Sequence, residues 1–306
     1  MRIAPDYIQL YPTLQCNRSC EFCFNRALPK VRDMSFKDFK RLLNKITELP
    51  VRSLDIIGGE PTLHSDILRF VRAASRRGLR VNISSNGTNI TALSKIQALD
   101  DLCNNTCIGI SINDIGIFKH VKEYVQQYKP VVKMVYNKCV DTNLITDILL
   151  LRPKKFYLLY CDIMVLDELQ TAIPFYQFLS AVNQWQAKDS QVGAVFCSGF
   201  LPETYSYPEL AKVRCAAGTT KLGIFPDGSV YPCNLFFGRK DYLLGNVLED
   251  PFDSIWNHPM LGYFRTFISN TCPKKKCILH TQCHGGCPAH SLFHTGDITA
   301  LDPRCA

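Results

Sequence analysis

The sequence contains no long hydrophobic run and no secretory signal. Among its 306 residues, no stretch reaches the roughly 18 consecutive apolar residues that a transmembrane helix needs. The N-terminal segment 1–6 lacks the apolar region and the cleavage site of a signal peptide, so we expect a cytoplasmic protein without a membrane partner. Low-complexity segments are also missing. The apolar (46%) and charged (20%) fractions are ordinary, which excludes a disordered or collagen-like chain.

The chain also has only a small excess of charge. It contains 35 Lys and Arg residues and 27 Asp and Glu residues, which gives a formal net charge of +8. This excess suits an anionic partner but does not require nucleic acid. The basic residues are spread along the chain and form no nucleic-acid-binding motif, so we expect no nucleic-acid partner.

Cysteine, by contrast, is abundant, with 15 residues. A cytoplasmic protein does not keep so many thiols for disulfides, and an odd number leaves at least one unpaired. Ten of them fall into two groups, three near the N-terminus and seven in the last third. The other five are dispersed in or beside apolar stretches, and we expect most of them in the core. These five are Cys103, Cys107, Cys139, Cys161 and Cys197.

The first two thirds of the chain alternate strand and helix patterns. The expected strand centres recur about every 25 residues, which is typical of a parallel sheet covered by helices. About six βα units fit, fewer than the eight of a closed barrel, so we predict an α/β protein with a partial (β/α)6 barrel. Ser35 and Ser65 are expected to cap helices. Strands are expected at residues 7–14, 54–57, 79–84, 106–112, 131–136 and 155–161.

Turn residues multiply after about residue 190, so we place a boundary near residue 195, between domains 1–195 and 196–306. In the second domain, Asp227-Gly228 separates two short apolar runs and predicts a β-hairpin. From Cys272 onward the chain has little apolar content. Such a tail cannot build its own core, so we expect metal to hold it together.

The first cysteine group is Cys16, Cys20 and Cys23, with spacing C-x3-C-x2-C. Zinc sites usually have four ligands in two closely spaced pairs, whereas here no fourth cysteine or histidine is near. The first histidine in the chain is His64. Three thiolates on one loop suit a cubane iron–sulfur cluster with one iron left open for a ligand.

Glycine-rich and polar motifs end the next three expected strands. They are Gly58–Pro61, Ser84–Thr88 and Ser111–Asp114, and parallel folds place ligands at such strand ends. Together with the cysteine spacing, these motifs resemble the radical S-adenosylmethionine (radical SAM) superfamily, whose GGEP motif Gly58–Pro61 matches. The resemblance implies that Glu60 accepts a hydrogen bond from the SAM ammonium group or shapes the loop. The implied SAM contacts are Gly58, Gly59, Glu60, Pro61, Ser84, Asn86 and Ser111.

The seven later cysteines resemble the SPASM domain, a C-terminal extension of many radical SAM enzymes that holds auxiliary 4Fe–4S clusters. The gaps after Cys277 and Cys283 match its pattern, whereas the gap after Cys272 is longer than usual. The resemblance implies one cluster on Cys215, Cys233 and Cys287. It implies a second cluster on Cys272, Cys277, Cys283 and Cys305. The first set lacks a fourth cysteine, which leaves an open iron, a water, or one of His280, His284 and His290 as the last ligand.

The resemblance implies three cofactor clusters, one on Cys16, Cys20 and Cys23 and two auxiliary, together with SAM and an external electron donor such as flavodoxin or ferredoxin. The reduced first cluster would cleave SAM to a 5′-deoxyadenosyl radical that abstracts a hydrogen atom from the substrate. Auxiliary clusters that accept an electron imply an oxidation, such as a crosslink, a thioether or a dehydrogenation. A redox-neutral turnover would need a thiol as hydrogen donor, and Cys161 and Cys197 are the candidates.

One position departs from the sulfatase-maturing members of the superfamily. Those enzymes carry an aspartate directly after the cysteine aligned with Cys233, whereas this chain has Asn234. Because an amide cannot take a proton from a substrate alcohol, we do not expect formylglycine formation.

The substrate expectation also comes from the resemblance. Many SPASM enzymes modify ribosomally made peptides, and oxidative modification of such a peptide is the main expectation. No leader-binding domain precedes Cys16, so a separate leader-peptide-binding protein is expected, or a substrate that needs none. The alternative is a dehydrogenase, decarboxylase or epimerase acting on a small molecule such as an aminocyclitol, sugar or tetrapyrrole. Rivals of another class are an electron carrier and a non-catalytic module that binds zinc and nucleic acid.

Overall fold

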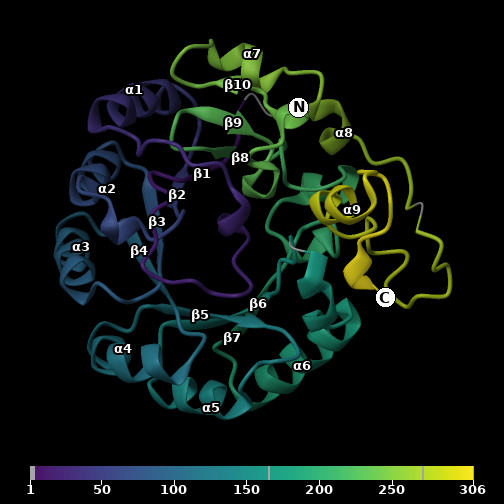
Figure 1. Cartoon of the computed structure of the whole chain (residues 1–306), viewed down its shortest axis with the longest axis horizontal. Coiled ribbons are helices and arrows are strands. Elements are labelled where there is room, and N and C mark those ends of the chain that lie inside the picture. Colours follow the sequence, from purple (N-terminus) through teal and green to yellow (C-terminus); the bar gives the residue numbers. More distant parts are fainter. Residues whose placement is uncertain (1–3, 165, 271, 306) are drawn as a thin grey trace.

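A computed structural model describes residues 4–164, 166–270 and 272–305. Within these residues, one curved sheet of ten strands runs in the order β10-β9-β8-β1-β2-β3-β4-β5-β6-β7 (Figure 1). Strands β1 to β8 are parallel, and β9 and β10 extend one edge in antiparallel fashion. The strands are β1 Tyr7–Leu10, β2 Ser53–Ile56, β3 Arg80–Ser85, β4 Thr106–Ser111, β5 Val131–Tyr136, β6 Lys155–Tyr160, β7 Val192–Val195, β8 Lys221–Ile224, β9 Ser229–Tyr231 and β10 Gly245–Asn246.

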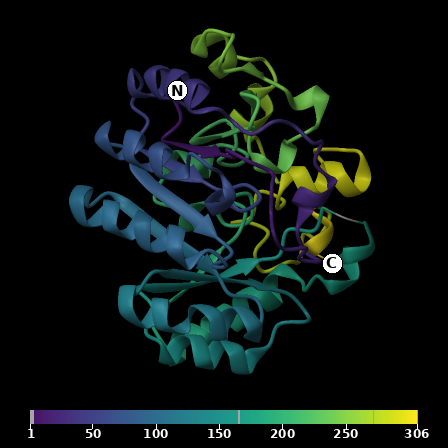
Figure 2. The ribbon, with the colours of Figure 1, turned by 60° about the vertical axis from the view of Figure 1, so that its left-hand side comes forward.

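The connecting helices cover the outside of this sheet. In Figure 1, α1 to α6 form an outer arc around the strands, and Figure 2 shows the C-terminal segment on the opposite side of the molecule. No helix among the described residues is long and apolar enough to cross a membrane. The helices are α1 Phe36–Thr47, α2 Ile67–Arg76, α3 Ile90–Cys103, α4 Ile115–Tyr128, α5 Thr142–Leu150, α6 Phe175–Lys188, α7 Phe252–Trp256, α8 Leu261–Arg265 and α9 Pro288–Thr295.

Side chains of the parallel strands alternate between two faces, as extended backbone requires. In β1, Ile8 and Leu10 are fully buried and belong to the same core as Phe39 and Phe70. The rings of those two phenylalanines stack with centroids 4.0 Å apart, which joins α1 to α2. The helix-facing side of the sheet is therefore a packed apolar layer.

The inner face of the sheet carries polar side chains. Asn82 Nδ2 donates to Asp55 Oδ1 at 2.6 Å, and Lys133 Nζ donates to Ser84 Oγ at 2.6 Å. Burial raises the pKa of Asp55 and lowers the pKa of Lys133. An open barrel with paired polar groups on its inner face offers a binding region for a polar ligand.

The structure confirms the partial α/β barrel and the capping box, in which the Ser35 side chain accepts a hydrogen bond from the Asp38 N–H. Several expectations were wrong in detail. The first strand ends at Leu10, before Pro12, and Asp66 rather than Ser65 precedes α2. The short strand β7 was not expected, because four residues that include Gly193 give little pattern.

The predicted hairpin is confirmed, because β8 and β9 pair in antiparallel fashion around Asp227-Gly228. Its first strand, β8, pairs in parallel with β1, with Tyr7 opposite Lys221, so one sheet runs through both predicted domains. A pairing between strands so far apart in sequence leaves no local signal. The boundary near residue 195 lies at the end of β7 and stays a prediction.

The dispersed cysteines do not all lie in the core. Cys161 is buried, Cys107 and Cys197 are half-buried, and Cys139 is exposed. The Cys103 side chain lies outside the described residues. The prediction of a core role is therefore wrong for Cys139, which lies on the loop after β5.

Candidate functional site

The first cysteine group lies on the loop that joins β1 to α1. Cys16 is exposed, and Cys20 and Cys23 are half-buried. The backbone N–H of Arg18 donates to Cys16 Sγ at 3.4 Å, and the N–H of Cys23 donates to the Cys20 carbonyl at 3.1 Å. Three accessible thiols on one tight loop fit a 4Fe–4S cluster that leaves one iron without a protein ligand.

Backbone hydrogen bonds join the residues after β2 to the segment that leads into this cysteine loop. The N–H of Gly59 donates to the Thr13 carbonyl at 3.0 Å, and the N–H of Glu60 donates to the Gln15 carbonyl at 2.7 Å. A Cβ atom on Gly59 would lie 2.2 Å from the Gln15 oxygen, so only glycine allows the two backbones to approach this closely. The Gly-Gly pair therefore positions the residue directly before Cys16.

Glu60 is fully buried and joins the end of β2 to the end of β3. Its Oε1 accepts hydrogen bonds from the Thr62 N–H (3.0 Å), the Thr62 hydroxyl (2.6 Å) and the Ser85 hydroxyl (2.9 Å). Its Oε2 accepts one from the Asn86 N–H at 2.6 Å. Since both oxygens are occupied by the protein, this geometry supports the loop-shaping role over a direct contact with SAM.

Two side-chain bridges tie the cysteine loop to β3 and β4. Asn86 Nδ2, after β3, donates to Asn17 Oδ1 at 2.9 Å. Arg18 Nη2 donates to Asp114 Oδ2, after β4, at 2.6 Å. The motifs that the sequence placed at three strand ends thus all hold the loop that carries the first cysteine group.

The other expected SAM contacts lie at the same edge of the sheet. Ser84 is half-buried and accepts the bond from Lys133, Ser111 is half-buried at the end of β4, and Pro61 is buried. Between the cysteine loop and the ends of β4 and β5 lies a cavity of about 460 Å³, lined in part by Cys20, Phe22 and Asn113. This cavity meets the cysteine loop, but none of the expected SAM contacts lines it, so these contacts remain predictions.

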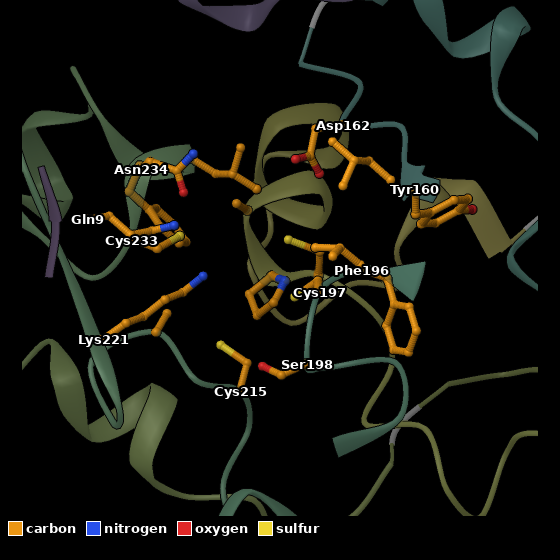
Figure 3. Close-up of a pocket in the computed structure, with 18 residues that line it drawn as sticks. Gln9, Tyr160, Asp162, Phe196, Cys197, Ser198, Cys215, Lys221, Cys233 and Asn234 are labelled. Carbon is orange, nitrogen blue, oxygen red and sulfur yellow. The ribbon is translucent and has the colours of Figure 1, made fainter. Parts of the chain in front are cut away.

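A second cavity, of about 200 Å³, brings together the cysteines expected to hold the first auxiliary cluster. Cys215, Cys233 and Cys287 line it, and a fourth cysteine, Cys197, lines it as well (Figure 3). Asp162 and Asn234 lie at its upper side in this view. Four thiols around one cavity fit the four-cysteine ligation of a 4Fe–4S cluster.

Lys221 of β8 also lines this cavity, and the sequence analysis missed it. Figure 3 shows its amino group pointing into the cavity between Cys215 and Cys233. Burial alone would lower the pKa of Lys221, but Tyr7, Cys233, Cys197 and Cys215 outweigh it and raise this pKa well above its usual value. A buried cation beside four thiols offsets the negative charge that thiolates carry.

A third, narrow cavity of about 50 Å³ unites the other expected ligand set. Cys272, Cys277, Cys283 and Cys305 line it together with apolar side chains such as Phe200. The ten cysteines expected as ligands thus lie in three groups, one on the loop after β1 and one around each of two cavities, and their role as ligands stays a prediction. Within the described residues, no three or more His, Cys, Asp or Glu side chains converge as they would around a single metal ion.

The candidate hydrogen donors are separated by the fold. Cys197 lines the 200 Å³ cavity, whereas Cys161 is buried and does not line it. Instead, the Cys161 carbonyl accepts a bond from Arg304 Nη1 at 2.8 Å, which ties the C-terminal segment to the end of β6. The donor role stays a prediction for both cysteines.

Comparisons with known proteins connect these features to a family. A family model for the radical SAM superfamily matches residues 10–142, and one for SPASM, an iron–sulfur cluster-binding domain, matches residues 215–288. These two stretches together exceed half of the chain and contain all the grouped cysteines except Cys305.

Two curated relatives are similar over most of this chain. The subtilosin biosynthesis protein AlbA of Bacillus subtilis is 21% identical over 300 residues, which cover 90% of this chain and 65% of AlbA, just under two thirds of that relative. The PqqA peptide cyclase of Methylobacterium sp. strain 4-46 is 23% identical, with coverage of 96% and 84%.

Solved structures share the fold. SuiB of Streptococcus suis bound to S-adenosylmethionine superposes with a TM-score of 0.76 at 20% identity, covering 98% of this chain and 77% of SuiB. The enzyme anSMEcpe with AdoMet and a Cp18Cys peptide gives 0.74 at 16% identity, with coverage of 99% and 94%. The chain belongs to the radical SAM superfamily and carries a C-terminal SPASM domain, and membership of these families implies SAM and 4Fe–4S clusters as cofactors.

Proposed function

We propose that this protein is a radical SAM enzyme that oxidatively modifies a ribosomally made peptide by forming a crosslink, a thioether or a dehydrogenated residue. The observation that carries the proposal is the arrangement of ten cysteines into one strand-anchored loop and two cysteine-lined cavities. An electron carrier would not need the tight anchoring of the cysteine loop to three strand ends. A zinc module would not need it either.

When bound, the first cluster and SAM supply a 5′-deoxyadenosyl radical that removes a hydrogen atom from the substrate. The chain supplies placement. Gly59 and Glu60 hold the backbone before Cys16, and Asn86 and Asp114 hold Asn17 and Arg18 on the loop. A loop fixed at three points keeps reacting groups within the small tolerance that such chemistry requires.

The two auxiliary sites support a net oxidation. The 200 Å³ cavity and the 50 Å³ cavity are each lined by four cysteines, and all eight cysteines lie in the range 197–305. A cluster held by either cysteine set would supply an acceptor for the electron that an oxidative modification releases. An external donor such as flavodoxin or ferredoxin would deliver the electron that starts each turnover.

The peptide substrate is supported by the relatives. AlbA is a bacteriocin biosynthesis protein, PqqA peptide cyclase acts on a peptide by its name, and SuiB has been solved with its precursor peptide SuiA at a TM-score of 0.75. A small-molecule substrate is the second candidate, because an AdoMet-dependent haem synthase is also 23% identical to this chain. A separate leader-binding protein is part of the peptide proposal.

The test is product analysis under anaerobic conditions. The reconstituted protein, SAM and dithionite should form 5′-deoxyadenosine, and a Cys16/Cys20/Cys23→Ala variant should not. A peptide encoded beside the gene should then lose two hydrogen atoms for each bond formed. If SAM is cleaved but the peptide mass stays unchanged with and without a leader-binding protein, the peptide proposal fails and the small-molecule candidate gains.

A further inference from the structure

We infer that Cys197 is the fourth ligand of the auxiliary cluster on Cys215, Cys233 and Cys287. The inference deepens the proposed function, because it assumes that this cavity holds one of the 4Fe–4S clusters. The spacing of the later cysteines leaves this set one thiol short, since Ala216 and Ala217 follow Cys215 and no cysteine occurs before Cys233. The missing thiol comes from the end of β7, upstream of the whole group.

The backbone after Cys197 is bonded to the segments that carry two of the other ligands. The Ser198 hydroxyl accepts a hydrogen bond from the N–H of Ala216, next to Cys215, at 2.7 Å. The carbonyl of Gly199 accepts one from the N–H of Gly286, next to Cys287, at 3.2 Å. Residues 197–199 are thereby held between Cys215 and Cys287.

Gly199 makes this approach possible. A Cβ atom at Gly199 would lie 2.1 Å from the Gly286 carbonyl oxygen, so any other residue would push the end of β7 away from Cys287. The same Gly199 carbonyl also accepts a bond from the His284 N–H at 2.8 Å. Hydrogen bonds from His284 and Gly286 thus hold Gly199 in place, and this gives the nearby Cys197 a defined position.

The Cys197 side chain faces the cavity together with Cys215 and Cys233 (Figure 3), and Cys287 lines the same cavity. The Cys197 and Cys287 side chains interact with each other. Lys221 lies close enough to Cys197, Cys215 and Cys233 for each to act on its charge. Four sulfurs and one cation therefore share one buried space.

The histidines are poorer candidates for the same position. His290 is fully buried, and its Nε2 accepts a hydrogen bond from the Ile163 N–H at 2.8 Å. In the neutral ring the proton is then on Nδ1. His290 interacts with the Cys287 side chain, which fits a hydrogen-bond donor beside a ligand thiolate rather than an iron ligand. His284 hydrogen-bonds through Nδ1 to the Val213 carbonyl at 2.8 Å, and His280 lines the other cysteine cavity. None of the three lines the 200 Å³ cavity.

Ligation by Cys197 changes the role of this cluster. The thiol loses its proton to solvent when its sulfur binds iron, and Lys221 offsets part of the added negative charge. With four cysteines bound, no iron is open to the substrate, so the cluster can pass electrons but cannot bind substrate directly. Cys197 then has no free S–H bond and is not the hydrogen-atom donor.

The inference is tested in a Cys16/Cys20/Cys23→Ala background, which removes the open iron of the first cluster. After anaerobic reconstitution and reduction, cyanide is added as a probe for an open iron, and the EPR spectrum is recorded. We expect no change with Cys197 present. We expect a cyanide-dependent change in Cys197→Ala, which should also give the signal of a 3Fe–4S cluster on mild oxidation. Cys139→Ala is the control, because this exposed thiol lines neither the 200 Å³ nor the 50 Å³ cavity and the cluster beside the 460 Å³ cavity is absent from this background.

Cys197→Ser separates ligation from loss of folding, because it preserves shape and offers an oxygen ligand. It should keep the iron content but shift the EPR spectrum and the reduction potential of this cluster. A cyanide response with Cys197 present would overturn the inference. An unchanged spectrum in both Cys197 variants would overturn it too. Neither readout depends on SAM cleavage or on a peptide. Failure of the proposed function would therefore leave the inference about Cys197 standing, and failure of that inference would leave the proposed function standing.

Discussion

Replacing Gly59 by alanine tests whether the strand-end motif positions the cysteine loop. The new Cβ atom would lie 2.2 Å from the Gln15 carbonyl oxygen and 2.6 Å from two backbone carbons of that loop. Relief of the overlap requires the loop to move by about 1 Å, since non-bonded atoms prefer separations near 3.5 Å. Because the obstacle is backbone, no side chain can rotate away, and we expect a cost of about 1–3 kcal/mol.

The displaced segment leads directly into Cys16, so the cluster should respond more than the fold. After anaerobic reconstitution, Gly59→Ala should lose most of the first cluster and bind SAM at least tenfold more weakly, with the auxiliary clusters retained. Gly262→Ala, where a Cβ atom would meet nothing within 4 Å, is the matched control and should behave as wild type. Full cluster occupancy together with unchanged SAM affinity in Gly59→Ala would refute the positioning role.

Three further perturbations have defined outcomes. Glu60→Gln places an amide donor against the N–H and hydroxyl donors around this buried side chain. We expect the free energy of unfolding to fall by about 1–3 kcal/mol and SAM to bind more weakly by calorimetry. An effect no larger than that of the exposed Glu123→Gln would contradict this expectation. Arg304→Met leaves Asp302 buried without its cation, and we expect the free energy of unfolding to fall by about 3–5 kcal/mol. Urea unfolding measures this fall, with the exposed Arg72→Met as the control. Equal unfolding midpoints in the two variants would refute the pairing. Removing the clusters with a chelator should abolish hydrogen-exchange protection in residues 272–305 while β1 to β6 stay protected, and retained protection in that tail would show that metal does not hold it together.

The Asp302–Arg304 pair also has a defined pH dependence. Burial would raise the pKa of Asp302, but Arg304 and its hydrogen bonds outweigh burial and hold this pKa at about 2. An unfolded aspartate titrates near a pKa of about 3.9. The stabilisation by the pair is therefore complete above that value and is lost as the pH falls toward 2. Because acid also releases iron–sulfur clusters, the test compares the free energy of urea unfolding at neutral and mildly acidic pH, at full iron content. The fall on acidification should be smaller in Arg304→Met than in the unsubstituted chain, and an equal fall would contradict the assignment.

Local sequence patterns predicted most of the barrel, because alternating strand and helix periods correspond to β1 to β6. The division of the later cysteines into two sets came from the resemblance to the SPASM domain, since Cys287 lies far in sequence from Cys215 and Cys233. The structure places the two sets at different cavities. Glu60 was expected at the site as well, but its four bonds within the protein became clear only from the contact between β2 and β3.

The missed features depend on contacts between distant segments. Cys197 follows a four-residue strand without a clear pattern, and its place beside Cys287 comes from the contact between Gly199 and Gly286. Lys221 looks like an ordinary strand lysine in the sequence, but pairing of β8 with β1 turns it toward four cysteines. Neither contact leaves a signal in residue spacing.

The most direct test of the account is the iron, acid-labile sulfide and zinc content of the anaerobically reconstituted chain. Three cubane clusters predict about twelve iron atoms and about as many sulfides for each chain. That result would support the cysteine loop and both cysteine-lined cavities as cluster sites. Zinc without iron would contradict the central claim, because neither the radical chemistry nor the auxiliary electron transfer could then take place.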